Sequence, residues 1–443
     1  MKQSTLRWRC YAKCRGYLVL CGRRLAGGAA RTLLSHSNNA SQRIESTCIL
    51  AAGSVTTVTL RLAMSTGKRH WAVYMSALGA ASSVFWVLRQ KTQAMCSVER
   101  PITKVRKEQI GVAEIIANQH MEDRHVIAEL PPGLIALGVF DGHGGSEVAE
   151  WLTQAMPIAL GQQLELESAA AGESKGNDEV ALTALRKAFC ECDEQLLRNV
   201  LPVARDMKFS NLVRVGACAV CVLIDSENLY VASAGDSRAV LVRGGKCVTI
   251  SKIHNADQPR EQMRLRHAHP GEDDLILCRQ PTGMVSRFTS RTPGCAEDLD
   301  APCYVKGRLQ PTRSFGDFYL KDKRFNFNYQ EGAPFLSQPS SPPYITAEPE
   351  VDVVQRRPED EFLLLASDGL FDYLTEQQVA DVCRRCVEQD KATPTQVARS
   401  LIQEAVGLAA TTHGFDLAGL MQMPAGRRRR RYHDDITVVC VRL

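Results

Sequence analysis

Acidic residues lie at one end of five short apolar runs in this 443-residue chain, and they constrain the fold more than any other feature. In "ALGVFDGHGGSEVAEWL", residues 136–152, the apolar run 137–140 has the length of a buried strand and ends at Asp141. Apolar residues then recur at helical spacing. Asp141, Gly142 and His143 are therefore predicted to lie in a turn between a strand and a helix, where glycine lets a ligand approach the backbone closely.

The other four runs repeat this arrangement of an apolar strand with acids at its end. The acids concerned are Glu122 and Asp123, Asp236, Asp368, and Asp434 with Asp435. A single acid in such a place usually caps a turn. Five such sites in one domain indicate a cluster, and clustered carboxylates repel one another unless a cation neutralises them. Oxygen ligands without His or Cys at ligand spacing favour Mg²⁺ or Mn²⁺, ions that commonly serve phosphate chemistry.

Charge divides the chain into two unlike regions. Residues 1–70 hold twelve Lys and Arg and one acid, a net +11; because the whole chain carries +5, residues 71–443 carry a net −6. A mildly acidic body argues against a nucleic-acid-binding core. The basic head is rich in Arg, Ser, Ala and Leu, a composition typical of mitochondrial or plastid transit peptides. A disordered basic tail that binds nucleic acid nonspecifically is the alternative.

The segment "WAVYMSALGAASSVFWVL", residues 71–88, carries no charge and is flanked by Arg69 and Arg89. As a helix it would be roughly 27 Å long, close to the ~30 Å of a hydrocarbon core. Aromatic residues lie near both ends, as in membrane anchors. We therefore expect a candidate transmembrane helix followed by a linker, residues 89–104. An amphiphilic linker or a part of the presequence is the alternative, and the charges on both flanks leave the orientation open.

The body is expected to be one catalytic domain, residues 105–443. Segments 168–179, 280–302 and 325–343 are rich in Gly, Ser, Pro and charge and are predicted to be surface insertions.

The sixteen cysteines are scattered through predicted strands and helices of a long chain, so we expect reduced thiols. Two CxxC pairs occur, at 218/221 and 383/386. Neither has a second pair at the spacing of a zinc site, so the sequence does not favour structural zinc.

Six motifs in this body resemble the metal-dependent type-2C Ser/Thr protein phosphatases, in the order that the family has them. They are "MED" (121–123), "VFDGHGG" (139–145), "AGDSRAVL" (234–241), "TRSFGD" (312–317), "SDGLFD" (367–372) and "DDITVV" (434–439). The resemblance implies an α+β fold of four layers, α-β-β-α, in which helices flank two packed antiparallel sheets. It also implies that metals bind at one edge of the sandwich.

The resemblance assigns a role to each acid. Asp141 would bridge two Mg²⁺ or Mn²⁺ ions with help from the Gly142 carbonyl. Asp368 and Asp434 would ligate one ion directly, and Glu122 and Asp123 would hold the other side through water. Asp236, together with Asp368, matches a third and weaker metal position.

Two metals about 3.5–4 Å apart would lower the pKa of a bridging water, and the resulting hydroxide would attack the phosphoryl group of a phosphoprotein in line. The departing serine alkoxide needs a proton, which an imidazole titrating near pH 6.5 can give. His143 is the candidate acid. The alternative is that His143 only orders Asp141 through a hydrogen bond.

Asn118 stands where many members of the family have an arginine that grips the substrate phosphate. An Asn brings neither charge nor a bidentate fork. Arg124 and His120 are nearby candidates to replace that arginine. The departure leaves open a second hypothesis, a catalytically weak relative that binds phosphoproteins as a regulator, although the intact acids favour an enzyme. Oligomeric state is not predicted.

Asn at this point, with an Arg after "ED", also resembles the mitochondrial pyruvate dehydrogenase phosphatases, as do "HNADQPREQMRLRHAHP" (254–270) and "YHDDITVV" near the end. Plant-like members of the family share "HNA" and "VKGRLQPTRSFGDFYLK" as well, which leaves that branch as the alternative. Because the transit-like head fits the mitochondrial branch, we expect a mitochondrial protein, in the matrix or at the inner membrane. The arginine run 427–431 is expected to be a solvated loop, or else a surface that attracts acidic phosphoprotein segments toward the metals.

Overall fold

The computed structural model describes residues 105–443 except 132, 172–175, 208–210, 280–287, 291–301, 328–332, 337–339 and 389–391, together with the backbone of five strands between residues 8 and 76. The chain divides into two units, residues 1–98 and 99–443. The strands of the first unit form two antiparallel sheets. They are β1 (Trp8–Cys10), β2 (Leu20–Gly22), β3 (Arg43–Leu50), β4 (Thr56–Met64) and β5 (Trp71–Ser76).

The candidate transmembrane segment 71–88 lies only partly within the described residues. Its first residues form β5, and residues 77–88 and the expected linker 89–104 lie outside the described part of the chain. Across the ranges that the structure describes, no helix combines the length and apolar character that crossing a bilayer requires.

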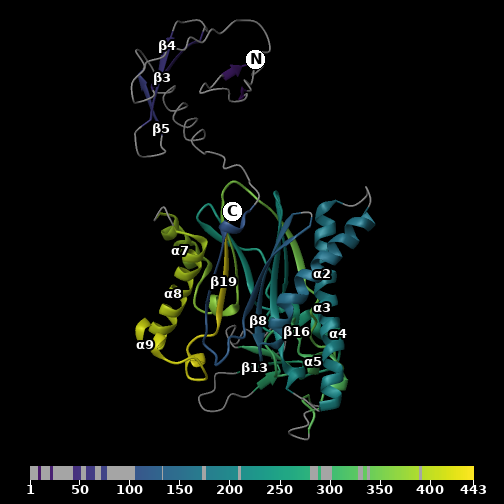
Figure 1. Ribbon diagram of the computed structural model, residues 1–443. Coiled ribbons are helices and arrows are strands. Elements are labelled where there is room, and N and C mark those ends of the chain that lie inside the picture. The colour runs from purple at the N-terminus through teal and green to yellow at the C-terminus, as the bar shows by residue number, and fades with distance from the viewer. Residues whose placement is uncertain are drawn as a thin grey trace. The chain divides into compact units, whose positions relative to one another are not determined.

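Two antiparallel sheets pack face to face in the second unit (Figure 1). The first has the order β17-β10-β9-β8-β7, with β16 paired to β9, and the second has the order β12-β11-β18-β19-β6. Their strands are β6 (Ile110–Ile115), β7 (Arg124–Leu130), β8 (Leu134–His143), β9 (Gly216–Ile224), β10 (Asn228–Ala234), β11 (Arg238–Arg243), β12 (Lys246–Thr249), β16 (Phe315–Gly316), β17 (Glu350–Gln355), β18 (Asp360–Ala366) and β19 (Ile436–Arg442).

The side-chain alternation of the central strands creates two apolar layers. In β8, Leu137 and Val139 join the cluster between the sheets, while Ala136 and Phe140 join the cluster beneath the helices. Successive side chains of a strand point to opposite faces, so a strand that is apolar throughout must be covered on both sides. β9 is buried along its whole length for this reason.

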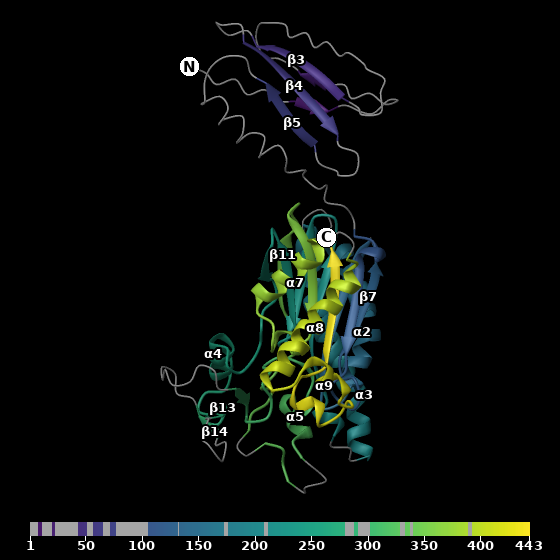
Figure 2. The ribbon, with the colours of Figure 1, turned by 90° about the vertical axis from the view of Figure 1, so that its left-hand side faces the viewer.

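Helices cover the outer face of each sheet. α2 (Glu147–Ala171) and α3 (Asn177–Met207) pack against the first sheet, and α7 (Glu376–Glu388) and α8 (Pro394–Thr412) pack against the second. Figure 2 shows α7 and α8 lying over their sheet. The predicted four-layer α-β-β-α fold is therefore confirmed. Shorter helices are η1 (Lys107–Gln109), η2 (Leu212–Arg214), α5 (Phe318–Lys321), η3 (Lys323–Phe325), α6 (Asp368–Phe371), α9 (Leu417–Gln422) and η4 (Arg429–Arg431).

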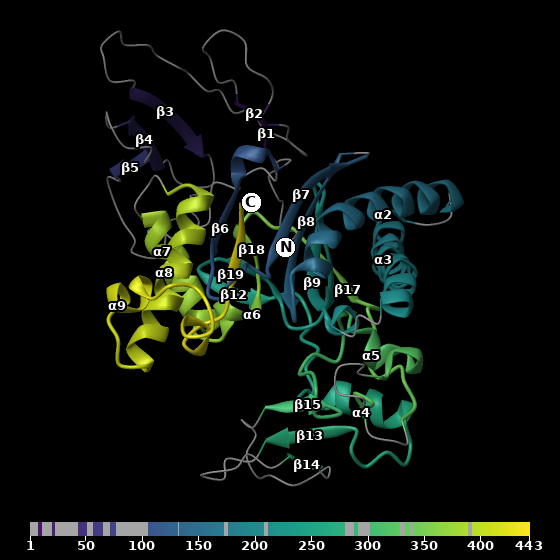
Figure 3. The same ribbon diagram turned by 60° about the horizontal axis from the view of Figure 1, so that its bottom comes forward.

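A small lobe beside the sandwich contains α4 (Pro259–Ala268) and the sheet β14-β13-β15 (Figure 3). Its strands are β13 (Ile276–Arg279), β14 (Phe288–Ser290) and β15 (Cys303–Val305). Cys278 and Cys303 lie directly opposite each other in the register and form a disulfide, so the expectation of reduced thiols is wrong for this pair. Most of the expected insertion 280–302 lies outside the described residues, whereas in 325–343 only residues 328–332 and 337–339 do.

Two local predictions differ from the structure. β8 does not end at Phe140 but continues through His143, because Asp141, Gly142 and His143 pair with Cys218, Ala217 and Gly216 of β9. The turn follows at Gly144 and Gly145, whose φ values of 73° and 150° suit glycine. The expected insertion 168–179 is partly helical, since its first residues extend α2 and its last begin α3.

Candidate active site and metal centre

Three carboxylates from distant parts of the chain converge at one edge of the sandwich. Asp141 comes from β8 in the first sheet, Asp236 from the turn between β10 and β11, and Asp368 from the start of α6, after β18 in the second sheet. One oxygen of each lies within 4.8 Å of the others. Because the turn at Asp236 connects the two sheets, the sandwich itself brings these acids together.

Burial and mutual repulsion raise the pKa values of this cluster. Burial first, and then the neighbouring carboxylates, hold the pKa of Asp141 and of Asp368 well above the ordinary range. The same causes raise the pKa of Asp123 to about 7 and that of Asp434 to about 6. Asp123 is also fixed in place, because it accepts a hydrogen bond of 2.6 Å from the Ser367 hydroxyl. Groups this costly to ionise together indicate a site for a divalent cation.

The donor atoms of the cluster fit Mg²⁺ or Mn²⁺. All are carboxylate oxygens, which hard cations prefer. Oδ1 of Asp368 is buried and has no hydrogen-bond partner among the described residues, so it is free to accept a cation. Glycine is required at 142, since a Cβ there would lie 2.5 Å from the carbonyl oxygen of Glu122. Burial and the charge of Asp435 raise the pKa of Glu122 at this side of the cluster.

Asp434 and Asp435 are adjacent but have different surroundings. Asp435 is buried and accepts hydrogen bonds from the backbone N–H groups of Ala117 (2.6 Å), Asn118 (3.0 Å) and Glu122 (2.8 Å). Asp434 instead forms an ion pair with Arg430. Asp435 therefore fixes the loop that carries Glu122, whereas the charge of Asp434 contributes to the raised pKa values of Asp141 and Asp368.

His143 contacts Asp317, a residue that sequence reasoning missed. His143 Nε2 lies 2.6 Å from Asp317 Oδ2, which also accepts a hydrogen bond of 2.8 Å from the Ser314 hydroxyl. Although burial opposes the charged imidazolium, the Asp317 carboxylate holds the pKa of His143 above its ordinary value. Gly216 makes room for the pair, since a Cβ there would lie 2.0 Å from Asp317 Oδ2. The only signal in the sequence was the position of Asp317 at the end of "TRSFGD".

Two of the three residues considered for the substrate phosphate, Asn118 and Arg124, are already engaged with the protein. The Asn118 amide donates to Glu122 Oε2 (3.4 Å) and Asp435 Oδ2 (3.3 Å). Arg124 donates to the carbonyls of Met121 and Asp123, both at 2.7 Å, and to Glu150 on α2 at 2.5 Å. His120 is exposed.

Comparison with known proteins identifies the family. Residues 113–413 match the family model "Protein phosphatase 2C". The chain belongs to this family. It is 30% identical to "Probable protein phosphatase 2C 67" of Arabidopsis thaliana over 76% of this chain and 83% of that protein. It is also 30% identical to "Probable protein phosphatase 2C 38" of the same plant over 75% and 80%, respectively. A solved serine-threonine phosphatase 2C from Toxoplasma gondii aligns with a TM-score of 0.49 and 18% identity over 75% of this chain and 94% of that one.

Membership makes this phosphatase 2C a Mg²⁺- or Mn²⁺-dependent enzyme that removes phosphate from Ser and Thr of phosphoproteins. The acid cluster supplies the oxygen donors that such ions require. The family match ends at residue 413, so Asp434 and the arginine run lie beyond it.

A second group of residues in the phosphatase could geometrically hold a metal, namely His254, Glu261 and Glu350. Arginines already balance these acids. Arg313 donates to Glu261 at 2.9 Å and to Glu350 at 3.4 Å, and Arg264 pairs with Glu261 at 2.9 Å. Burial raises the pKa of Glu261, but the hydrogen bonds and charges of these arginines more than offset that effect. The pKa of Glu261 therefore falls to about 2. The group is an ion-pair network that has no need of a cation.

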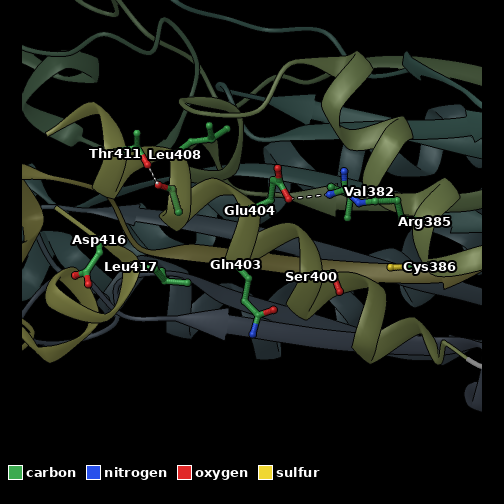
Figure 4. A pocket seen from close by; sticks show the side chains of 11 residues that line it. Val382, Arg385, Cys386, Ser400, Gln403, Glu404, Leu408, Thr411, Asp416 and Leu417 are labelled. Carbon is green, nitrogen blue, oxygen red and sulfur yellow. Dashed lines mark hydrogen bonds and ion pairs between the residues drawn. The ribbon is translucent and has the colours of Figure 1, made fainter. Parts of the chain in front are cut away.

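A surface hollow of about 630 Å³ lies between α7, α8 and α9 (Figure 4). Arg385 and Glu404 form an ion pair of 2.7 Å across it, and Gln403 and Asp416 add further polar groups. None of the acids of the cluster lines it. The acid cluster at the sheet edge is therefore separate from this hollow.

Proposed function

We propose that the acid cluster binds two divalent ions, with a third position at Asp236 and Asp368, and that it hydrolyses phosphoserine and phosphothreonine there. The observation that carries the proposal is the convergence of three carboxylates within 4.8 Å, with the pKa values of Asp141 and Asp368 raised by burial and repulsion. The ligands would be Asp141 with the Gly142 carbonyl, Asp368 and Asp434, Glu122 and Asp123 through water, and Asp236.

Bound divalent ions would lower the pKa of a water and neutralise charge on the phosphoryl group. The chain's own residues supply the rest. Asp141, held in β8 by its pairing with Cys218, stays in place while the substrate enters. His143 is two residues further along the same strand and gives a proton to the departing serine oxygen. Asp317 holds the imidazole ring through its hydrogen bond and stabilises the charged form.

The alternative is a relative that binds phosphoproteins without turnover, because Asn118 replaces a phosphate-gripping arginine. The clustered acids favour hydrolysis. A protein that only bound phosphoproteins would gain stability by replacing carboxylates whose mutual repulsion has no function.

Release of phosphate from a phosphoserine peptide by the full chain tests the proposal. We expect turnover with Mn²⁺, none with chelator, and a loss of at least about a hundredfold for Asp141→Asn. Asp352→Asn is a matched control, because Asp352 is an exposed acid on β17. Turnover that survives chelation would contradict the metal-dependent mechanism. Binding of the phosphopeptide without any turnover would support the regulator instead.

We further propose that the protein is located in mitochondria, in the matrix or at the inner membrane. Its substrate there would be a phosphoprotein such as pyruvate dehydrogenase. The support for this proposal is the basic head, Asn118 and the motif at 254–270. A fluorescent fusion of residues 1–100 tests the address, and extraction with carbonate tests whether residues 71–88 anchor it. Diffuse fluorescence in the cytoplasm would contradict a mitochondrial address.

A further inference from the structure

Arg430 places its positive charge near three acids that lie outside the group Asp141, Asp236 and Asp368. It forms an ion pair with Asp434, and its positive charge also works to lower the pKa values of Glu122 and Asp372. These three acids come from different segments: the loop before β7, the end of α6, and the loop before β19. Asp434 and Asp372 both raise the pKa of Asp368, so the guanidinium of Arg430, paired with Asp434, lies near one side of the cluster.

The loop that carries Arg430 is docked on the segment that carries Asn118. The N–H of Gly426 donates to the carbonyl of Ala117 at 2.8 Å, directly before Asn118. On the other side, the hydroxyl of Tyr373 donates to the carbonyl of Tyr432 at 2.5 Å. The loop of Arg430 is thus hydrogen-bonded to Ala117, the neighbour of Asn118, which stands where many family members have the phosphate-binding arginine.

Neighbouring arginines of the run have different surroundings. Arg429 is buried, and its Nε donates to Nε2 of His433 at 2.9 Å. Arg430, by contrast, keeps 47% of its side chain exposed while it faces Asp434. Arg429 therefore holds the loop, and Arg430 presents a charged group to solvent at the edge of the cluster.

We propose that Arg430 binds the phosphate of the substrate and so replaces the arginine that is absent at position 118. This inference rests on the proposed phosphatase function. A guanidinium has five N–H donors in a planar fork that matches phosphate oxygens, and the contact with Asp434 leaves donors free. Arg124 cannot serve equally, because its guanidinium is held by Met121, Asp123 and Glu150.

Binding of inorganic phosphate to the Mn²⁺-saturated full chain tests the proposal without turnover. Calorimetry should show that Arg430→Gln weakens phosphate binding by roughly ten- to hundredfold, since a charge-assisted hydrogen bond is lost. Arg430→Lys, which keeps the charge but not the fork, should lie between. Arg384→Gln is the matched control, because Arg384 is an exposed arginine paired with Asp381 on α7.

Two results would overturn the proposal. If Arg430→Gln changes the affinity for Mn²⁺ but not that for phosphate at saturating Mn²⁺, Arg430 is only the counter-ion of Asp434. If Arg431→Gln weakens phosphate binding as much as Arg430→Gln does, the run acts through its general field and no arginine grips the phosphate. A protein without turnover whose phosphate binding still depends on Arg430 would contradict the proposed function and leave this inference intact.

Kinetics separate the two roles of the run. Arg430→Gln should raise the Michaelis constant for an aryl phosphate and for an acidic phosphopeptide alike, because both carry the same phosphoryl group. Replacing Arg427, Arg428 and Arg431 together by Gln should raise it mainly for the acidic peptide. An aryl phosphate that is indifferent to Arg430→Gln would contradict the proposal.

Discussion

His143 Nε2 lies 2.6 Å from Asp317 Oδ2, although 174 positions separate the two residues in the chain. The contact exists because β16, which immediately precedes Asp317, pairs with Gly216 and Ala217 at the start of β9, next to the end of β8. Asp317 itself has φ of 50°, an unusual value for a residue with a side chain. The fold therefore holds Asp317 in a costly conformation at the one place where its carboxylate meets His143.

Asp317→Asn should reduce catalysis in a manner that depends on the leaving group. Serine alkoxide is a poor leaving group and needs the proton that His143 gives, whereas a nitrophenolate does not. We expect kcat to fall by about a hundredfold for a phosphoserine peptide and by less than about threefold for p-nitrophenyl phosphate. Equal losses for both substrates would mean that Asp317 supports the fold of the site and not the ring of His143.

Gly216→Ala should produce the same pattern without altering either partner of the pair. The new Cβ would lie 2.0 Å from Asp317 Oδ2 and 2.5 Å from His143 Nε2, so the carboxylate and the ring must separate. Gly407→Ala on α8 is the control, because a Cβ there meets nothing within 4 Å. Steady-state kinetics with both substrates make the test. Wild-type activity of Gly216→Ala on the phosphoserine peptide would contradict the role of the contact.

Asp368→Asn should stabilise the protein in chelator and abolish its stabilisation by Mn²⁺. The pKa of Asp368 is higher in the folded protein than in the unfolded chain, so the folded state holds its proton more tightly. The free energy of unfolding therefore decreases as the pH rises above about 4. Removing the charge should therefore raise the free energy of unfolding at pH 8 by about 1–2 kcal/mol without metal. Thermal melts with chelator and with Mn²⁺ measure both effects. A lower melting temperature of the variant in chelator would show that Asp368 is not under this repulsion.

Much of the site follows from local sequence, because its acids lie where apolar runs stop. Asp236 and Asp368 occupy the predicted turn and strand end, and Glu122, Asp123 and Asp434 lie within two residues before a strand. A strand end can be read from a few neighbouring residues, since burial requires an apolar run and a turn interrupts it. The four-layer fold follows from the resemblance and from strands that are apolar on both faces.

The remaining features depend on contacts that local sequence does not encode. Asp317 meets His143 through the pairing of β16 with β9. Asp435 and Asp434 differ in their partners, because Asp435 accepts a hydrogen bond from the backbone N–H of Ala117 and Asp434 pairs with Arg430. β8 runs past Phe140 because β9 offers Gly216 and Ala217 as partners, so tertiary pairing outweighs the glycines that predicted a turn. The disulfide of Cys278 depends in the same way on the register of β13 and β15.

Acid should destabilise the phosphatase through His254. Burial and the nearby Arg313 lower the pKa of His254 to about 3, and Arg260, Glu261 and Glu350 also face it. Its contribution to stability is full above its ordinary pKa of about 6.5 and is lost as the pH falls below that value. Glu261, with its pKa of about 2, adds its own loss only below about pH 4.5.

Urea unfolding at pH 6.5 and at pH 5 measures this effect in a window that excludes Glu261. We expect the wild-type protein to lose roughly 2 kcal/mol more between these pH values than His254→Gln does. The same pH dependence in both proteins would mean that His254 does not stay neutral in the fold.

The location of bound Mn²⁺ tests the central claim most directly, because both the chemistry and the roles of the acids depend on it. Crystals of the full chain grown with Mn²⁺ should give anomalous difference peaks beside the carboxylates of Asp141, Asp368 and Asp434, at about 2.0–2.3 Å from their oxygens. Peaks confined to the group of His254, Glu261 and Glu350, or no peak beside Asp141 at millimolar Mn²⁺, would contradict the account.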